Sequence, residues 1–99
     1  MSIGETSQGA AARLAVEGEM TIYRAAELHS VLLDAVRTMD APSLDLSEVT
    51  EFDCAGMLLL LVARREARRL GKDLVLQGAS PAVRDAFALL GMTAQGEPA

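Results

Sequence analysis

The sequence predicts a small α/β domain in which three main helices cover a mostly parallel, four-stranded sheet. The first observation is the order of patterns along the chain, which is strand, strand, helix, strand, helix, strand, helix. The second is composition: of 99 residues, 51% are hydrophobic and only 3% aromatic, which is typical of one aliphatic core. We therefore expect a single domain over residues 1–99, with its core at about 13–91.

The first two strands are expected before Gly18. Residues 1–12 are small and polar, and they are predicted to contain a short edge strand that turns at Gln8-Gly9. Residues 13–18 alternate apolar and polar side chains, and Gly18 is expected to end this second strand.

The next segment is predicted to be an amphipathic helix. Thr21 is the expected N-cap, and the helix is expected to end before Pro42. The single histidine, His29, lies at the edge of the apolar stripe with no cysteine or second histidine near it, so we interpret it as a surface residue. The apolar residues at helical spacing are Ala25, Leu28, Leu32, Ala35, Val36 and Met39.

A strand, a tight loop and the start of a second helix are predicted between Leu44 and Leu61. Asp53 is the expected N-cap, since its carboxylate can accept hydrogen bonds from amides two or three residues on and lies at the positive end of the helix dipole. The inward-facing candidates are Leu44, Leu46, Val49 and Phe52, and the polar residues expected in a connecting turn are Ser47, Glu48, Thr50 and Glu51.

The last third of the chain is predicted to be a helix end, a strand and a third helix. Gly71 is expected to close the second helix, and residues 72–78 form a strand pattern. Ser80-Pro81 is typical of a helix start, with serine at the cap and proline at the first helical position, and Gly91 is expected to end that helix. Residues 92–99 are expected to fray.

Composition argues against several classes of function. A net charge of -5 argues against a nucleic-acid partner, because phosphate binding requires a basic face. No Gly-rich phosphate loop, zinc-ligand spacing or catalytic set is present in the sequence, so we expect no enzyme activity, no cofactor and no metal. The N-terminus lacks a signal-peptide pattern and the longest apolar run, residues 57–63, is too short to cross a bilayer, which favours the cytoplasm and excludes direct membrane insertion.

The residues Asp45-Leu46-Ser47, Val49, Asp53 and Gly56 resemble the core signature of STAS domains, the fold of bacterial anti-sigma-factor antagonists. The resemblance implies a module for signal transduction by partner switching, in which one protein binds another. It also implies that the residue just before the glycine is the serine or threonine that a partner kinase phosphorylates. Ala55 occupies that position here, so the usual phosphoacceptor is predicted to be missing.

The second helix is predicted to have a core side and a binding side. The core side consists of Leu59, Leu60, Ala63, Ala67 and Leu70. The opposite side is apolar at its start, with Met57, Leu58, Val62 and Leu61, and then basic, with Arg64, Arg65, Arg68 and Arg69. Apolar anchors rimmed by arginine are typical of protein-binding surfaces, although the chain's own loops could also cover them. The STAS resemblance favours an interface made of Asp53, Cys54, Ala55, Gly56, Met57, Leu58 and Leu61.

The favoured hypothesis is a non-enzymatic module that binds an anti-sigma factor or a similar histidine-kinase-like protein. The alternative is a STAS subunit of a chemosensory-type cluster or of a phospholipid-trafficking ABC transporter. A third hypothesis, from another class, is a thiol-dependent enzyme or redox sensor that uses Cys54, because a helix N-terminus favours the thiolate form. A lone cysteine among leucines is more typical of a small buried hydrophobe, which we prefer. The partner's identity, the upstream signal and the oligomeric state stay open.

Overall fold

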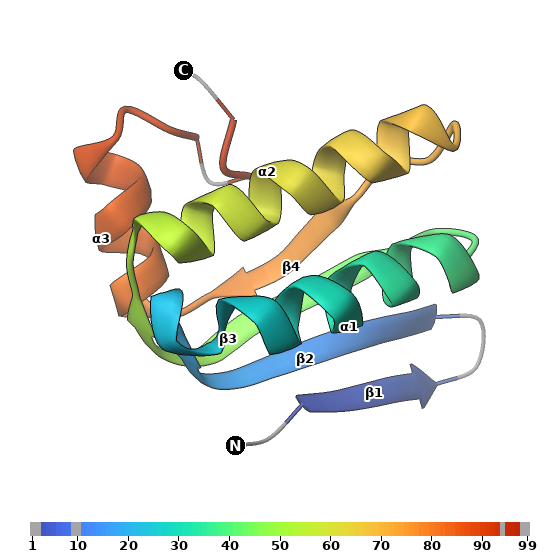
Figure 1. Cartoon of the computed structure of the whole chain (residues 1–99), viewed down its shortest axis with the longest axis horizontal. Coiled ribbons are helices and arrows are strands. Elements are labelled where there is room, and N and C mark those ends of the chain that lie inside the picture. The colour runs from blue at the N-terminus through green and yellow to red at the C-terminus, as the bar shows by residue number, and fades with distance from the viewer. Residues whose placement is uncertain (1–2, 9–10, 94, 98–99) are drawn as a thin grey trace.

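The computed structural model describes residues 3–8, 11–93 and 95–97 of the chain (Figure 1). Its strands and helices follow the predicted order, with a short 3₁₀ helix added before the first α-helix. The elements are β1 (Ile3–Gln8), β2 (Ala11–Met20), η1 (Ile22–Arg24), α1 (Ala25–Thr38), β3 (Ser43–Phe52), α2 (Cys54–Arg69), β4 (Val75–Ala79) and α3 (Pro81–Leu89). Gly9, where we expected the first turn, lies outside the described residues.

The strands form one sheet in the order β1-β2-β3-β4. The parallel part contains three strands and not four, because β2, β3 and β4 run parallel while β1 pairs antiparallel with β2 at the edge. Helices α1 and α2 lie side by side on one face of this sheet, and α3 lies across one end (Figure 1). The result is a small α/β fold with three helices and a parallel sheet.

The core lies between this sheet and the helices. The strands β2, β3 and β4 contribute apolar side chains from one face of the sheet, and each α-helix contributes one apolar stripe. The fully buried side chains include Val16, Met20, Leu28, Leu32, Val36, Leu44, Leu46, Leu60, Val49 and Val83. Phe52 and Phe87 meet edge to face near α3, with ring centroids 5.9 Å apart, and this contact attaches α3 to the end of β3.

The predicted helix caps of α2 and α3 are confirmed. The Asp53 carboxylate caps α2, and the Ser80 hydroxyl accepts a hydrogen bond from the amide of Val83 at 3.3 Å, with Pro81 at the first position of α3. Gly71 and Gly91 have positive φ at the ends of α2 and α3, where a residue with a side chain would be strained.

Three local predictions were wrong. Ser47, Glu48, Thr50 and Glu51 form no connecting turn, because β3 continues to Phe52 and carries these four exposed side chains, while Val49 between them is buried. Gly18 does not end β2; it has a φ of +81° inside the strand, beside a shift in the β2–β3 register. Thr21 precedes η1 and not α1, and its hydroxyl makes no capping hydrogen bond.

The described C-terminal residues pack against the domain, contrary to the expected fraying. The Gln95 side chain accepts a hydrogen bond from the amide of Leu76 at 3.0 Å and donates one to the carbonyl of Leu76 at 3.1 Å. Arg64 donates to the carbonyl oxygens of Gln95 and Gly96. These bonds fasten residues 95–97 across the outer edge of β4 and the side of α2.

Candidate functional site

The candidate site is built around the carboxylate of Asp53, at the junction of β3 and α2. One carboxylate oxygen, Oδ1, accepts hydrogen bonds from the amides of Ala55 at 2.8 Å and Gly56 at 3.2 Å. The other oxygen, Oδ2, accepts one from the amide of Ile22 at 3.2 Å. A single side chain therefore caps α2 and holds η1 beside the start of that helix.

Gly56 allows α2 to start close to the end of β2. A Cβ atom at this position would lie 2.4 Å from the carbonyl oxygen of Met20 and 2.9 Å from the Phe52 ring. Atoms this close would overlap, so no other residue fits without moving the backbone. Close packing therefore explains why the sequence signature has a glycine at this position. Gly56 is buried, so it supports the predicted interface at the start of α2 without being exposed in it.

Cys54 and Ala55 lie on the first turn of α2. Cys54 is exposed, so the interpretation of a small buried hydrophobe was wrong. Beside it is an apolar pocket of about 190 Å³, lined by Phe52, Asp53, Cys54, Ala86, Leu89 and Leu90. Ala55 is half-buried and presents only a methyl group at the position where the resemblance implied a hydroxyl.

The apolar row of α2 is exposed as predicted, with one exception. Leu58 is 61% exposed, Leu61 38% and Val62 40%, so this side of the helix start is not covered by other described parts of the chain. Met57, however, is only 5% exposed and belongs to the core. Its predicted place on the binding surface was wrong.

The basic half of the helix also needs one correction. Arg64 is 6% exposed, because its guanidinium binds the carbonyls of residues 95–96, whereas Arg65, Arg68 and Arg69 are exposed. Met57 lies two turns before Arg64 on the same row of the helix. The buried arc of α2 is therefore wider than the sequence pattern indicated. Leu70, predicted in the core, is 39% exposed at the helix end.

Two exposed apolar pairs next to α2 were missed by the sequence analysis. Ile22 and Tyr23 of η1 are 65% and 88% exposed, and Leu89 and Leu90 at the end of α3 are 88% and 50% exposed. Each pair consists of adjacent residues, and adjacent positions on a helix face different directions. This rule could have predicted an exposed apolar residue in each pair, since two adjacent helical residues cannot both face the core.

The described residues offer little for chemistry. Within them, no group of three or more histidine, cysteine, aspartate or glutamate side chains is placed to hold a metal ion. His29 is exposed on α1, as expected for a surface residue. Among the helices that the structure describes, none has both the length and the apolar character required to cross a bilayer.

Comparison with known proteins agrees with this fold. A profile of the family described as "Mlab, STAS domain" matches residues 3–94. No curated protein sequence matches the chain at a significant level.

Several solved structures are similar over most of the chain. The anti-sigma factor antagonist SpoIIAA in its unphosphorylated form has a TM-score of 0.72 at 17% identity, and the match covers 92% of this chain and 82% of that one. An anti-sigma factor antagonist from Mycobacterium paratuberculosis has a TM-score of 0.72 at 19% identity, covering 91% and 77%. A variant of RsbS from Moorella thermoacetica has a TM-score of 0.70 at 20% identity, covering 99% and 85%. At these identities the likeness is one of fold.

Proposed function

The chain belongs to the STAS domain family, and from that membership we propose that it is a non-enzymatic, cytoplasmic protein-binding module that acts like an anti-sigma-factor antagonist. The proposed partner is an anti-sigma factor or a similar histidine-kinase-like protein. The family match and the likeness in fold to anti-sigma factor antagonists support the proposal.

The observation that carries the proposal is the exposed apolar surface at the start of α2. We define the α2-start surface as the exposed and half-exposed residues Asp53, Cys54, Ala55, Leu58 and Leu61. Exposure of its two leucines to water is unfavourable unless a partner covers them. Cys54, one helical turn before Leu58, lines the apolar pocket together with Leu89 and Leu90. Arg65 continues the same row of α2, so the surface has apolar anchors and a basic edge, as protein interfaces do.

The proposal includes a permanently binding-competent form. A phosphate at the position of Ala55 would add about -1.5 to -2 charges to an apolar contact and break it, and alanine has no hydroxyl to accept one. Ser47 and Thr50 lie on β3, and Ser80 is buried at the start of α3, so none of these hydroxyls replaces it in the first turn of α2. In this form binding is regulated through the partner or through the concentration of this protein, and not by phosphorylation of the first turn of α2.

A second candidate function uses the same surface. In this second function the chain is a permanent STAS subunit of a phospholipid-trafficking ABC transporter or of a chemosensory-type cluster. The match to the family described as "Mlab, STAS domain" favours this candidate, and Ala55 fits it, because a permanent subunit has no need of a phosphorylation switch. The identity of the protein bound at the α2-start surface separates the two.

The test places a charge on the α2-start surface. The partner is first identified as the protein that co-purifies with the wild-type chain. Leu58→Asp and Leu61→Asp are expected to fold like the wild type. Both are expected to bind this partner at least tenfold more weakly than the wild type does, because an unpaired charge is costly in a desolvated interface. Circular dichroism checks the fold and titration calorimetry the affinity. His29→Asp, on α1, is the matched surface control and is expected to bind normally.

Core positions on the same helix provide the opposite control. Leu60→Asp is expected to unfold the domain, and Met57→Asp to destabilise it strongly, because both side chains are buried. Normal partner binding by both Leu58→Asp and Leu61→Asp would refute the proposed surface. Cys54→Ala tests the thiol hypothesis. The wild type and the variant are expected to bind the partner equally well under reducing and under oxidising conditions. A wild-type affinity that changes with redox conditions, and no longer changes in Cys54→Ala, would support a thiol function.

A further inference from the structure

Beside the α2-start surface, η1 presents a second set of exposed apolar side chains. Tyr23 is 88% exposed and Ile22 is 65% exposed, although both are large enough to be valuable in a core. Single exposed apolar residues are common on protein surfaces. Here two adjacent ones stand on a one-turn helix whose amide is bonded to the same Asp53 that caps α2.

The backbone that carries these side chains is held in place. Besides the bond from the amide of Ile22 to Asp53, the amide of Arg24 bonds to the carbonyl of Thr21 at 3.0 Å. The guanidinium of Arg24 extends back to β2 and donates to the carbonyl of Glu17 at 2.9 Å. An aromatic side chain on a backbone that is already held loses little conformational freedom on binding, and aromatic residues often dominate interface energies.

Acidic side chains lie on β2 and β3, the two strands that end beside η1. In the β2–β3 register, Glu17 lies beside Glu48 and Glu19 lies beside Glu51, so two like-charged pairs occupy neighbouring strands. Like charges placed opposite each other destabilise a sheet, and among the described residues none of these four carboxylates forms an ion pair. Glu19 accepts a hydrogen bond from the hydroxyl of Thr21 at 3.4 Å, which brings no opposite charge to offset this repulsion.

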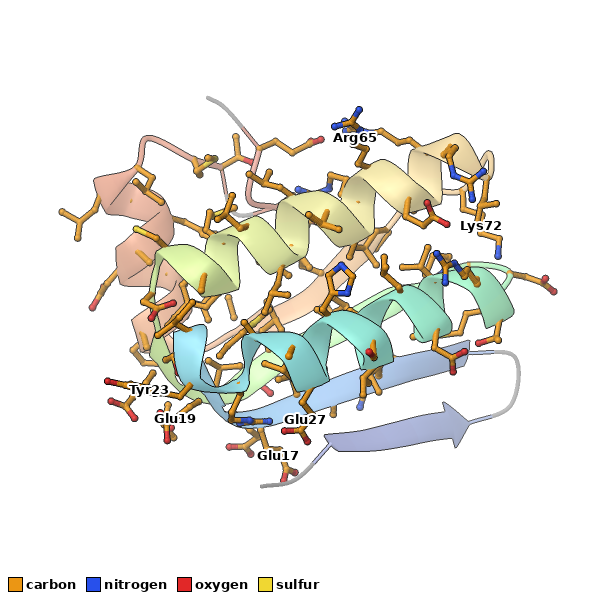
Figure 2. The ribbon with its side chains drawn as sticks, viewed as in Figure 1. Glu17, Glu19, Tyr23, Glu27, Arg65 and Lys72 are labelled. Atoms are coloured by element: carbon orange, nitrogen blue, oxygen red, sulfur yellow. The ribbon has the colours of Figure 1, made fainter. Side chains whose placement is uncertain are left out.

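Figure 2 shows which labelled charges lie near Tyr23. Glu17, Glu19 and Glu27 lie with Tyr23 in the lower left part of the view, whereas Arg65 and Lys72 lie in the upper right part. The only cation of the η1 turn, Arg24, is half-buried and is bonded to a backbone carbonyl. The surroundings of Tyr23 are therefore negative at neutral pH.

We propose that η1 is a second docking element, which seats Tyr23 in an apolar pocket of a basic protein surface while lysines or arginines of that surface meet Glu17, Glu19, Glu48 and Glu51. This inference rests on the proposed function, because η1 and the α2-start surface would contact the same partner. Opposite charges across an interface fix its register and accelerate association, and the carboxylates are repelled less once cations lie between them.

Photocrosslinking tests which molecule lies over η1. The photoreactive residue p-benzoylphenylalanine is placed in turn at Tyr23, at Leu58 and, as a distant control on α1, at Asp34 of the full-length chain in its host. The protein crosslinked from each position is identified, and the crosslinked peptide is mapped. The expected result is one and the same protein from Tyr23 and Leu58, with lysine or arginine flanking the peptide reached from Tyr23, and none from Asp34.

The contributions of Tyr23 and of the carboxylates to affinity are then measured with variants and with the purified protein that the crosslinking identified. Tyr23→Ala is expected to weaken binding about tenfold or more, since buried aromatic anchors are typical hot spots. The double variant Glu19→Gln with Glu51→Gln is expected to bind more weakly, to lose part of the salt dependence of affinity, and to resist urea at least as well as the wild type. Asp34→Asn, exposed on α1, is the matched charge control and is expected to behave like the wild type.

Each outcome decides something different. A partner that crosslinks from position Leu58 but not from position Tyr23 would overturn the role of η1 and leave the proposed function intact. Crosslinking from neither position would overturn both. A crosslink from Tyr23 to a second copy of this chain would overturn the inference in favour of self-association through the basic end of α2. An affinity independent of salt would refute the charge part of the inference.

Discussion

The Cβ atom that Gly56 lacks would lie 2.4 Å from the carbonyl oxygen of Met20, a backbone atom that cannot rotate away. Gly56→Ala is therefore expected to destabilise the domain by about 1–3 kcal/mol, because the strain of overpacking exceeds the gain of about 1 kcal/mol from better helix propensity. The urea midpoint measures the change. Cys54→Ala, exposed on the same turn, is the control and is expected to be nearly neutral; a stabilised Gly56→Ala would contradict the close approach.

In the proposed function, Ala55 is the residue that makes binding constitutive, because it has no hydroxyl to phosphorylate. Ala55→Glu is expected to weaken partner binding by about 1–3 kcal/mol, because a carboxylate must be desolvated in an apolar contact, although the helix dipole offsets part of this cost. Ala55→Ser is expected to bind like the wild type. Intact-mass analysis of wild-type protein after incubation with partner and ATP is expected to show no added phosphate; a phosphate lost in Thr50→Ala or Ser80→Ala would contradict the constitutive form.

At the scale of elements, Glu66 joins the far ends of α1 and α2. Its carboxylate accepts hydrogen bonds from Arg37 of α1 at 3.1 Å and from Arg69 of α2 at 2.9 and 2.8 Å. Lys72 adds bonds to the carbonyls of Val36 and Arg37 at the end of α1. The bonds from Arg69 and then Arg37 lower the pKa of Glu66 to about 2.

This lowered pKa predicts a loss of stability in acid. A carboxylate with a pKa below its unfolded value stabilises the fold above pH 4.5, and that contribution is lost as the pH falls from 4.5 to about 2. Urea unfolding of the wild type at about pH 5 and about pH 3 is expected to show this loss, and Glu66→Gln is expected to reduce it. Part of the slope remains in the variant, because hydrogen bonds from Ser47 also lower the pKa of Asp45. An unchanged slope in Glu66→Gln would contradict the assignment.

Elements with local signals could be predicted from the sequence. The caps of α2 and α3 and the glycines that end these helices depend on neighbouring residues, so their positions were found correctly. The length of β3 was not. Its second half was interpreted as a turn because its residues are polar. In the structure α1 and α2 lie on one face of the sheet, so the other face can carry polar side chains, and there the hydroxyl of Ser47 donates a hydrogen bond to Asp45 at 2.6 Å.

At the scale of the molecule, the errors in the site come from contacts between distant segments. Arg64 follows the pattern of a solvated arginine and is buried only because residues 95–97 fold back over it. No periodicity within α2 contains that information. The exposed position of Leu58 and Leu61 was correctly predicted because nothing described from another part of the chain covers their row. Their role in binding stays a prediction.

The carboxylate of Asp53 bonds to the amide of Ile22, which lies 31 residues earlier in the chain, and to two amides in the first turn of α2. A fluctuation that releases this side chain uncaps the helix and, in the same event, removes one of the bonds that hold η1, another being that of Arg24 to Glu17. The two neighbouring surfaces therefore share one equilibrium between an ordered and a locally open state. The fraction of time that Asp53 stays bonded therefore affects the order of both surfaces together, and with it the readiness of the proposed site to bind.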